Sequence, residues 1–193
     1  MRGIGRPERH IWHGSAADHY GLGLIALHWL TLALIATAFA LGLWLADMPL
    51  SPLKLKLYAW HKWIGLLVLA LLPLRLWLRV RDRLDRLQEL EPWEARLSAL
   101  VHGLIYLLMV LVPLLGWLHS SAAGFSVVWF GVLPLPDLVD KQPELAKVLK
   151  AMHESAVYFL AGIVVIHALA ALYHHHIQRD QVLRRMIPWL RAP

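Results

Sequence analysis

The sequence predicts an all-α membrane protein, a bundle of four transmembrane helices with both chain termini in the cytoplasm. Of the 193 residues, 59% are hydrophobic and 17% are charged, and the mean hydropathy is +0.53. Soluble domains carry more charge and have fewer uninterrupted apolar runs. The apolar residues here form four runs of about 20 residues, the length that crosses a hydrocarbon core of roughly 30 Å at about 1.5 Å per residue.

Each apolar run defines one predicted span. The spans are expected at about residues 22–45, 58–79, 97–118 and 152–173. Pro73 and Pro113 fall inside spans, where membrane helices tolerate proline because neighbouring helices satisfy the freed carbonyl groups. The small residues at 36–38 resemble a signal-peptide cleavage site, but the apolar run continues to Leu45. We therefore expect a retained first helix and a single transmembrane domain over residues 1–193.

The arginines predict how the spans are oriented. They cluster before the first span, between the second and third spans, and after the fourth; among them are Arg2, Arg6, Arg9, Arg79, Arg81, Arg83, Arg86, Arg179, Arg184, Arg185 and Arg191. The other two loops carry lysines, balanced by acidic residues, and no arginine. By the positive-inside rule, both termini and the loop between the second and third spans face the cytoplasm. The loop at 120–151 then faces outside, and its Trp129 and Phe130 indicate that part of it lies on the membrane surface.

Charge and cysteine content exclude several classes of function. The formal net charge is +6, but the arginines flank the apolar runs and form no basic module, so nucleic-acid binding is not expected. The absence of cysteine excludes disulfides, iron–sulfur clusters, thiolate-ligated haem and haem attached covalently through a C-x-x-C-H motif. The ten tryptophans suit the aromatic belts of membrane interfaces, whereas the twelve histidines need another explanation.

The fourth span carries two histidines on one face. It runs inward in the predicted orientation, so His153 lies near the outer surface, and His167, 14 residues later, lies about 21 Å deeper. At about 100° per residue, the two side chains differ by only about 40° around the helix axis. One helix therefore presents two imidazoles at two depths.

Two further histidines lie at matching depths. His61 begins the second span, which also runs inward, so it lies near the outer surface with His153. His28 lies near the start of the first span, which runs outward, so it lies near the inner surface with His167. A haem iron takes two axial imidazoles from opposite sides, so each pair suits one b-type haem. A single histidine in a span is usually interfacial, but two depth-matched pairs of costly polar residues favour a functional role as ligands.

Two arginines and one glycine are candidate contacts of these haems. Arg75 lies 14 residues after His61 on a similar face, near the depth of the inner haem. Arg75 and Arg79 are candidates for charge-assisted hydrogen bonds with haem propionates. The alternative, extension of the side chain to the inner interface, is equally expected for Arg79 and less so for Arg75. Gly65, one turn after His61, is expected to let a flat macrocycle approach the helix, or else to serve helix packing.

The remaining histidines are weaker candidates. His102 and His119 are 17 residues apart and do not share a helix face, which favours interfacial roles, although His102 is also a candidate contact for a propionate or a quinone. His174, His175 and His176 are adjacent in sequence, and adjacent helical residues diverge by about 100°. All three therefore do not readily face one ion, and an interfacial role is favoured over proton transfer near a quinone and over metal binding.

Several motifs carry a family resemblance. They are LHWL around His28, HKWIG from His61, LRLWLR ending at Arg79, HGLIYLLMVLVPLLGW from His102, WFG from Trp129, HE from His153, and IHALAALYHHHIQRDQVLRRMIP from Ile166. In these motifs the chain resembles the bacterial cytochrome b561 family, over most of its length from about residue 20 to residue 188. The last motif is long and specific.

The resemblance implies a cofactor, a redox partner and a location. It implies two haem b groups with His28, His61, His153 and His167 as ligands, electron exchange with quinone in the bacterial inner membrane, and a link to the oxidation of superoxide at the outer face. The N-terminus departs from the family pattern, because about 20 residues precede the first span and no arginine stands just before the His28 helix.

The predicted function is that of an oxidoreductase. We expect the protein to be a di-haem b-type cytochrome that transfers electrons across the membrane. The electrons would pass between a small outer-face donor and ubiquinone or another membrane quinone, and superoxide is one candidate for the donor. Membrane lipid is the other expected partner, and the oligomeric state is left open. The alternative is a haem-bearing anchor or relay subunit of a dehydrogenase or hydrogenase, which the lack of large soluble segments disfavours. A haem-free transporter would need buried acidic or cationic relays in its spans, and no carboxylate lies in the middle of a predicted span.

Overall fold

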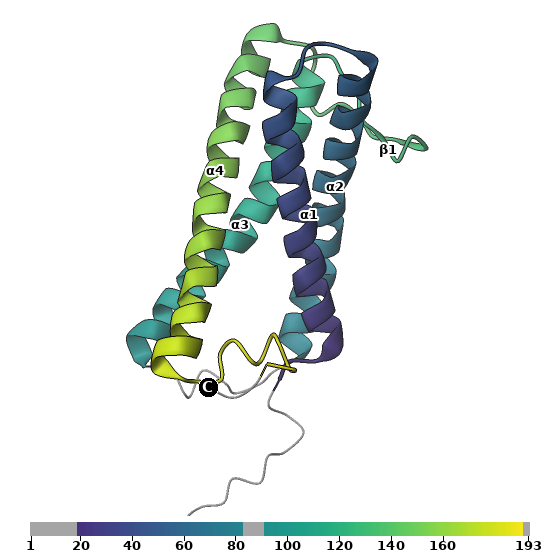
Figure 1. Cartoon of the computed structure of the whole chain (residues 1–193). Coiled ribbons are helices and arrows are strands. Elements are labelled where there is room, and N and C mark those ends of the chain that lie inside the picture. The colour runs from purple at the N-terminus through teal and green to yellow at the C-terminus, as the bar shows by residue number, and fades with distance from the viewer. Residues whose placement is uncertain (1–18, 83–90, 191–193) are drawn as a thin grey trace, which may run out of the picture.

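The protein is a bundle of four long helices (Figure 1). The computed structural model describes residues 19–82 and 91–190. The helices are α1 (Leu22–Asp47), α2 (Pro52–Arg81), α3 (Pro92–Ala122) and α4 (Pro143–Tyr173). Each is long and apolar enough to cross a membrane, so the predicted all-α membrane fold is confirmed.

The helices extend beyond the predicted spans because their starting residues favour helix initiation. Proline occupies the first turn of α2, α3 and α4, where its missing N–H is not needed. The Ser51 side chain also accepts a hydrogen bond from the backbone N–H of Lys54, and Glu91 and Glu94 form a reciprocal capping box at the start of α3. As a result, α4 begins at Pro143 rather than at residue 152, and all four predicted spans lie inside helices.

The two ends of the bundle differ, and we name them by what they carry. The hairpin end holds the link between α1 and α2 and the longer link between α3 and α4. The terminal end holds the start of α1 and the end of α4, so both described chain ends lie on the same side (Figure 1). Which side faces the cytoplasm stays a prediction. Six of the arginines on which this prediction rests lie outside the described residues: Arg2, Arg6, Arg9, Arg83, Arg86 and Arg191.

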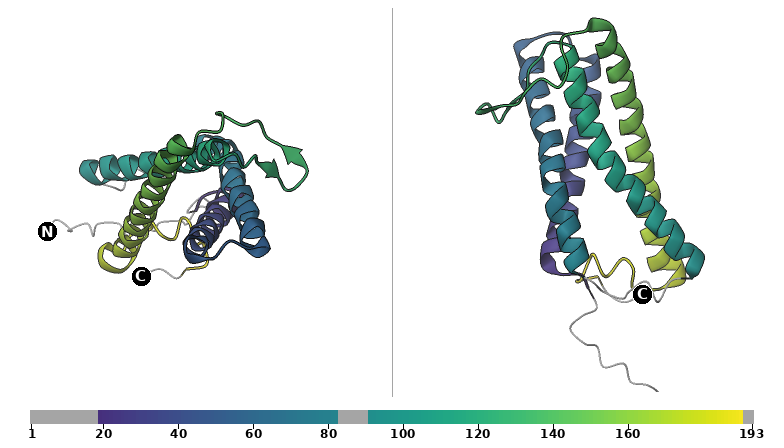
Figure 2. Two further views of the ribbon diagram at one scale, coloured as in Figure 1. Left: turned by 90° about the horizontal axis from the view of Figure 1, so that it is seen from above. Right: turned by 180° about the vertical axis from the view of Figure 1, so that it is seen from behind.

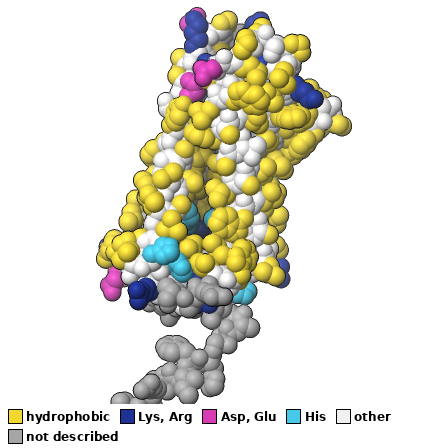
Figure 3. Space-filling view, in the orientation of Figure 1, with side chains coloured by type: hydrophobic (Ala, Val, Ile, Leu, Met, Phe, Trp, Pro, Cys, Tyr) yellow, Lys and Arg dark blue, Asp and Glu magenta, His cyan; other side chains and the backbone are white. Residues whose placement is uncertain are grey.

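Neighbouring helices pack in pairs. Among the described residues, α1 packs against α2, α2 against α3, and α3 most extensively against α4, whereas α1 and α4 do not pack closely. The two pairs lie close together at the hairpin end and diverge toward the terminal end (Figures 1 and 2). In Figure 3 the face between α4 and α1 is hollowed, with histidine and cationic side chains visible inside.

Buried apolar clusters join the helices at two levels. Val68, Leu72, Ile105 and Met109 form one cluster between α2 and α3. The other, between α3 and α4 near the hairpin end, contains Leu115, Ala122, Ala146 and Leu149. Most other apolar side chains cover the outside of the bundle (Figure 3), as expected where the solvent is lipid.

The link between α3 and α4 contains a short β-hairpin. Strand β1 (Val128–Trp129) pairs antiparallel with β2 (Leu133–Pro134). The turn places Phe130 (φ 51°) and Gly131 (φ 74°) in the left-handed region. Two indole N–H groups hold the hairpin on α2, since Trp63 donates to the Val128 carbonyl at 2.7 Å and Trp129 to the Trp63 carbonyl at 3.2 Å.

The C-terminal segment crosses the terminal end of the bundle. After α4 comes the π-helix η2 (His174–Gln178), which ends at Arg179 in the left-handed region. The segment then runs back to α1 (Figure 1), where the Trp29 indole donates to the Met186 carbonyl at 3.0 Å and the Tyr20 N–H to the Arg185 carbonyl at 3.1 Å. The C-terminal segment therefore links α4 to α1 at the terminal end, where the helix pairs are farthest apart.

Candidate functional site

Four histidines from three helices form two pairs in the interior of the bundle. The ring centres of His61 on α2 and His153 on α4 are 6.2 Å apart, toward the hairpin end. Those of His28 on α1 and His167 on α4 are 6.3 Å apart, toward the terminal end. Each histidine thus lies beside the partner that helix direction assigns to it. We refer to these as the hairpin-end pair and the terminal-end pair.

The spacing within each pair suits a metal ion held between two imidazoles. Metal–imidazole bonds of about 2.0 Å, with about 1.1 Å from each nitrogen to the centre of its ring, separate two such ring centres by about 6.2 Å. The two pairs match this separation. His102 does not, because its ring centre lies only 5.0 Å from that of His167. The fit therefore selects His28 rather than His102 as the partner of His167.

Backbone carbonyls orient both rings of the hairpin-end pair. Nδ1 of His61 lies 3.0 Å from the carbonyl oxygen of Ala38, and Nδ1 of His153 lies 3.0 Å from that of Val112. A carbonyl only accepts, so Nδ1 carries the proton in each ring and the lone pair is left on Nε2. Histidine ligands are commonly fixed in this way, with one nitrogen bonded to the protein and the other left for the metal.

Two glycines make room for these rings. Gly42 and Gly116 each follow the accepting carbonyl residue by four positions, one helical turn later. A Cβ at Gly42 would lie 3.4 Å from Cε1 of His61, and a Cβ at Gly116 would lie 3.1 Å from Cε1 of His153. Sequence reasoning missed both glycines. Its own candidate, Gly65, has no atom of the described residues within 4 Å of where a Cβ would lie, and its role beside a macrocycle stays a prediction.

The terminal-end pair has a cation in place of a carbonyl. Nη2 of Arg75 donates to Nδ1 of His28 at 2.8 Å, because a guanidinium has no acceptor. In this arrangement the proton of the neutral His28 ring is on Nε2. Nε2 can ligate a metal only after Arg75 releases Nδ1.

Arg75 lacks one hydrogen-bond partner. The side chain is buried, with 9% of its surface exposed, and its Nε has no acceptor within the described part of the chain. Its Nη1 lies 3.9 Å from the thioether sulfur of Met109, a weak acceptor. A carboxylate beside this guanidinium would supply the missing acceptor and compete with His28 for it. The residues at this end therefore fit a cofactor that carries an anionic group.

Arg79 lies farther out than Arg75. It is exposed, and its Nη1 donates to the Tyr106 hydroxyl at 3.3 Å. Both guanidinium carbons lie 5.4 Å from the centre of the Tyr106 ring, so the two cations contact the same aromatic ring. Of the two predicted propionate partners, Arg75 points into the site and Arg79 borders it.

The two histidines of α3 have structural hydrogen bonds. His102 donates from Nδ1 to the Ser98 carbonyl at 2.6 Å on its own helix, with its ring beside His167. His119 donates from Nδ1 to the Ala146 carbonyl at 3.0 Å and so joins α3 to α4. His102 is thus a neighbour of the terminal-end pair, and His119 belongs to neither pair.

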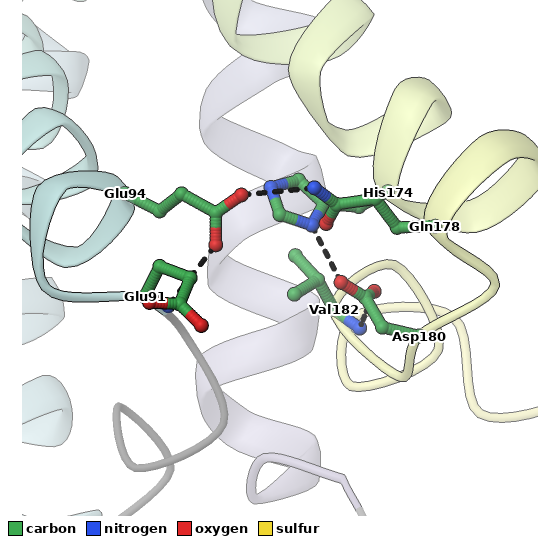
Figure 4. Close-up of polar contacts among 6 residues, drawn as sticks. All are labelled: Glu91, Glu94, His174, Gln178, Asp180 and Val182. Atoms are coloured by element: carbon green, nitrogen blue, oxygen red, sulfur yellow. Dashed lines mark hydrogen bonds and ion pairs between the residues drawn. The ribbon is translucent and has the colours of Figure 1, made fainter.

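The three consecutive histidines have separate surroundings. His174 bonds through Nδ1 to a carboxylate oxygen of Asp180 at 2.5 Å, and close by, Gln178 donates to Glu94 at 2.8 Å (Figure 4). His175 is buried and stacks edge-on with His176, with ring centres 4.8 Å apart. Within residues 19–82 and 91–190, no three or more His, Cys, Asp or Glu side chains are grouped so that they could hold a metal ion.

Comparisons with known proteins identify a family and several relatives. The family model described as prokaryotic cytochrome b561 matches residues 19–189. Cytochrome b561 homolog 2 of Escherichia coli (strain K12) is 29% identical over 172 residues, covering 88% of this chain and 92% of the relative. Cytochrome b561 homolog 1 of the same strain is 31% identical over 170 residues, covering 85% and 94%. The probable superoxide oxidase CybB of Yersinia pestis is 30% identical over 178 residues, covering 85% and 93%.

Proposed function

The chain belongs to the prokaryotic cytochrome b561 family, and we propose that it is a di-haem cytochrome that carries electrons between an outer-face donor and membrane quinone. Membership makes it a multi-pass bacterial membrane protein of electron transfer that binds haem b. The number of haems, their ligands and the two redox partners are our proposal. His61 and His153 are assigned to an outer haem, and His28 and His167 to an inner haem.

The spacing of the two imidazole pairs carries the proposal. Both ring separations match that of two ligands on one iron, and α4 supplies one histidine to each pair. His153 and His167 lie about 21 Å apart along this helix, so the two sites are at different depths in the membrane. When bound, two haems supply one-electron redox chemistry at both depths. Two imidazoles on each iron would leave no coordination position for a substrate.

Backbone and side-chain groups of this chain orient the ligands and affect the redox potential. At the outer site, the carbonyl groups of Ala38 and Val112 keep the Nδ1 protons of the ligands in place, which leaves both Nε2 atoms for iron. At the inner site, Arg75 is the buried cation available to a propionate. A guanidinium in this position stabilises the more negative, reduced state of a neighbouring redox centre.

The glycine beside His153 provides a first test of the outer site. Gly116→Ala places a methyl group 3.1 Å from the ring, so we expect it to shift His153 and to weaken outer-haem binding by about ten-fold, the lower range for losing an orienting contact. The readout is haem retained per chain and the spectrum of the outer component during titration with haem.

Gly103 is the matched control on the same helix, because a Cβ there meets nothing within 4 Å. Gly103→Ala should keep both haems, and it should not weaken the helix, since alanine favours helix by about 0.5–1 kcal/mol over glycine. Equal haem loss in both variants would mean that any added methyl group on α3 is harmful and that Gly116 has no special role.

The lysines close to His61 favour a small anionic donor, and we propose superoxide. Nζ of Lys62, next to the ligand His61, donates to Ser120 at 3.0 Å, and Lys54 and Lys56 lie on the first turns of the same helix. A cationic entrance raises the encounter rate of an anion. Superoxide would lose one electron and leave as oxygen, and two such electrons with two protons would reduce one quinone. The relative named as a probable superoxide oxidase supports this choice.

Stopped-flow reduction of the purified protein by superoxide tests the donor. We expect the rate to fall as ionic strength rises, and to fall roughly ten-fold when Lys54, Lys56 and Lys62 are all changed to glutamine. The control is Lys147→Gln, because Lys147 is exposed and already paired with Glu144 at 2.8 Å. A rate indifferent to salt and to the three lysines would identify a protein or quinol as the electron source.

A further inference from the structure

The link between α3 and α4 exposes an apolar surface beside the bundle. From Phe125 to Pro136 the sequence contains no charged residue. The tip of the hairpin is exposed: 83% of Val132, 52% of Leu133 and 51% of Phe130 is accessible. In Figures 1 and 2 the hairpin projects sideways beside α2, toward the hairpin end, and does not cover the end of the bundle. Its tip thus faces the region that lipid occupies around a membrane protein.

The contacts with Trp63 set the depth of the hairpin. Lys62 is the last charged residue before the apolar run of α2, which extends from Trp63 to Leu74. Because charged side chains are costly inside the hydrocarbon, Trp63 marks the point where the helix enters it. Helical side chains also point back toward the N-terminus, which raises the indole toward the surface. The hairpin therefore lies near the boundary between headgroups and hydrocarbon.

The hydrogen bonds of the hairpin suit this boundary. Its two strands form only a short ladder, and unpaired backbone groups are not tolerated in the hydrocarbon itself. The two indole N–H groups that tether it are both satisfied, by the carbonyl oxygens of Val128 and Trp63. The rings of Trp63 and Trp129 pack on Phe130, with centres 5.5 Å and 5.0 Å apart. Indole and phenyl groups with this arrangement favour the membrane interface.

We propose that the hairpin is an interfacial anchor whose partner is the lipid of the leaflet at the hairpin end. Phe130, Val132 and Leu133 insert between headgroups and acyl chains, and the backbone stays at the interface. Trp63 connects this anchor to the turn of α2 that carries His61, so contact with lipid also fixes the outer end of α2. The anchor does not depend on the proposed redox partners.

Spin labels at single cysteines can measure this depth, because the chain has no cysteine of its own. The haem-loaded protein with Val132→Cys is labelled with a nitroxide and placed in phosphatidylcholine liposomes. Collisions with oxygen, which concentrates in lipid, are compared with collisions with a water-soluble nickel chelate. Asp140→Cys, on the exposed polar part of the same loop, is the control, and Leu107→Cys, on the lipid-facing side of α3, marks the membrane interior.

We expect the logarithm of the oxygen-to-nickel collision ratio to be positive at 132 and 107 and negative at 140. A negative value at 132 would mean a solvated loop and would overturn the anchor. Low collision with both reagents, with dipolar broadening that grows with protein density, would show a second copy of the chain at this surface and would also overturn it. Adding Trp63→Phe, which removes the donor to Val128, should shift the label at 132 toward the nickel reagent. An unchanged depth would contradict the role of the tether.

Discussion

Alanine at His167 is expected to remove the same haem component as alanine at His28. His61→Ala and His153→Ala should instead remove the other component. Each single variant is expected to fall from two haems to one per chain, because a lone imidazole leaves the iron without its second axial ligand. The loss is measured as haem per chain and as the disappearance of one of two components in a redox titration.

The reason for this grouping is the geometry of α4. This helix provides one ligand to each pair, His153 toward the hairpin end and His167 toward the terminal end, whereas α1 and α2 provide one ligand each. The control is His119→Ala, because His119 bonds to the Ala146 carbonyl and belongs to neither pair. It should keep both components. Loss of the same component in His28→Ala and His61→Ala would show that the pairing is wrong.

Replacement of Arg75 by leucine is expected to have the second largest effect. A hydrogen bond to a charged group contributes about 1.5–3 kcal/mol, so loss of the guanidinium should weaken inner-haem binding by at least about ten-fold. The potential of the remaining inner haem should also fall, because removal of a buried positive charge destabilises the reduced state. Both effects are read from haem titration and from a potentiometric titration of the inner component.

Arg79→Leu is the matched control for charge. Arg79 lies one turn from Arg75 and contacts the same Tyr106 ring, but it is exposed at the edge of the site. Its removal should shift the inner potential much less, because solvent screens an exposed cation. An effect of Arg79→Leu as large as that of Arg75→Leu would move the propionate contact to the edge of the bundle.

The sequence was sufficient for the features that depend on helix direction and spacing. Apolar runs of membrane length predicted the four helices, which the structure confirms. The 14-residue interval between His153 and His167, together with the alternating direction of the spans, predicted which histidines lie side by side. These features require only the rise and the twist of a single helix.

The sequence did not predict features that depend on how one helix is rotated or tilted against another. Gly42 and Gly116 could be recognised only after Ala38 and Val112 were known to face His61 and His153. The position of His102 beside His167 depends on the tilt of α3 across the bundle (Figure 2). No periodic pattern along one helix contains this information.

Haem content per chain tests the central claim most directly. The protein is purified without added haem, its chain concentration is determined by amino-acid analysis, and haem is extracted with acidified organic solvent and quantified. We predict two b haems per chain, both removed by extraction because the chain has no cysteine for covalent attachment, and two components in the redox-difference spectrum. A content of one haem or none in the folded protein would contradict the assignment of His28, His61, His153 and His167 as two ligand pairs.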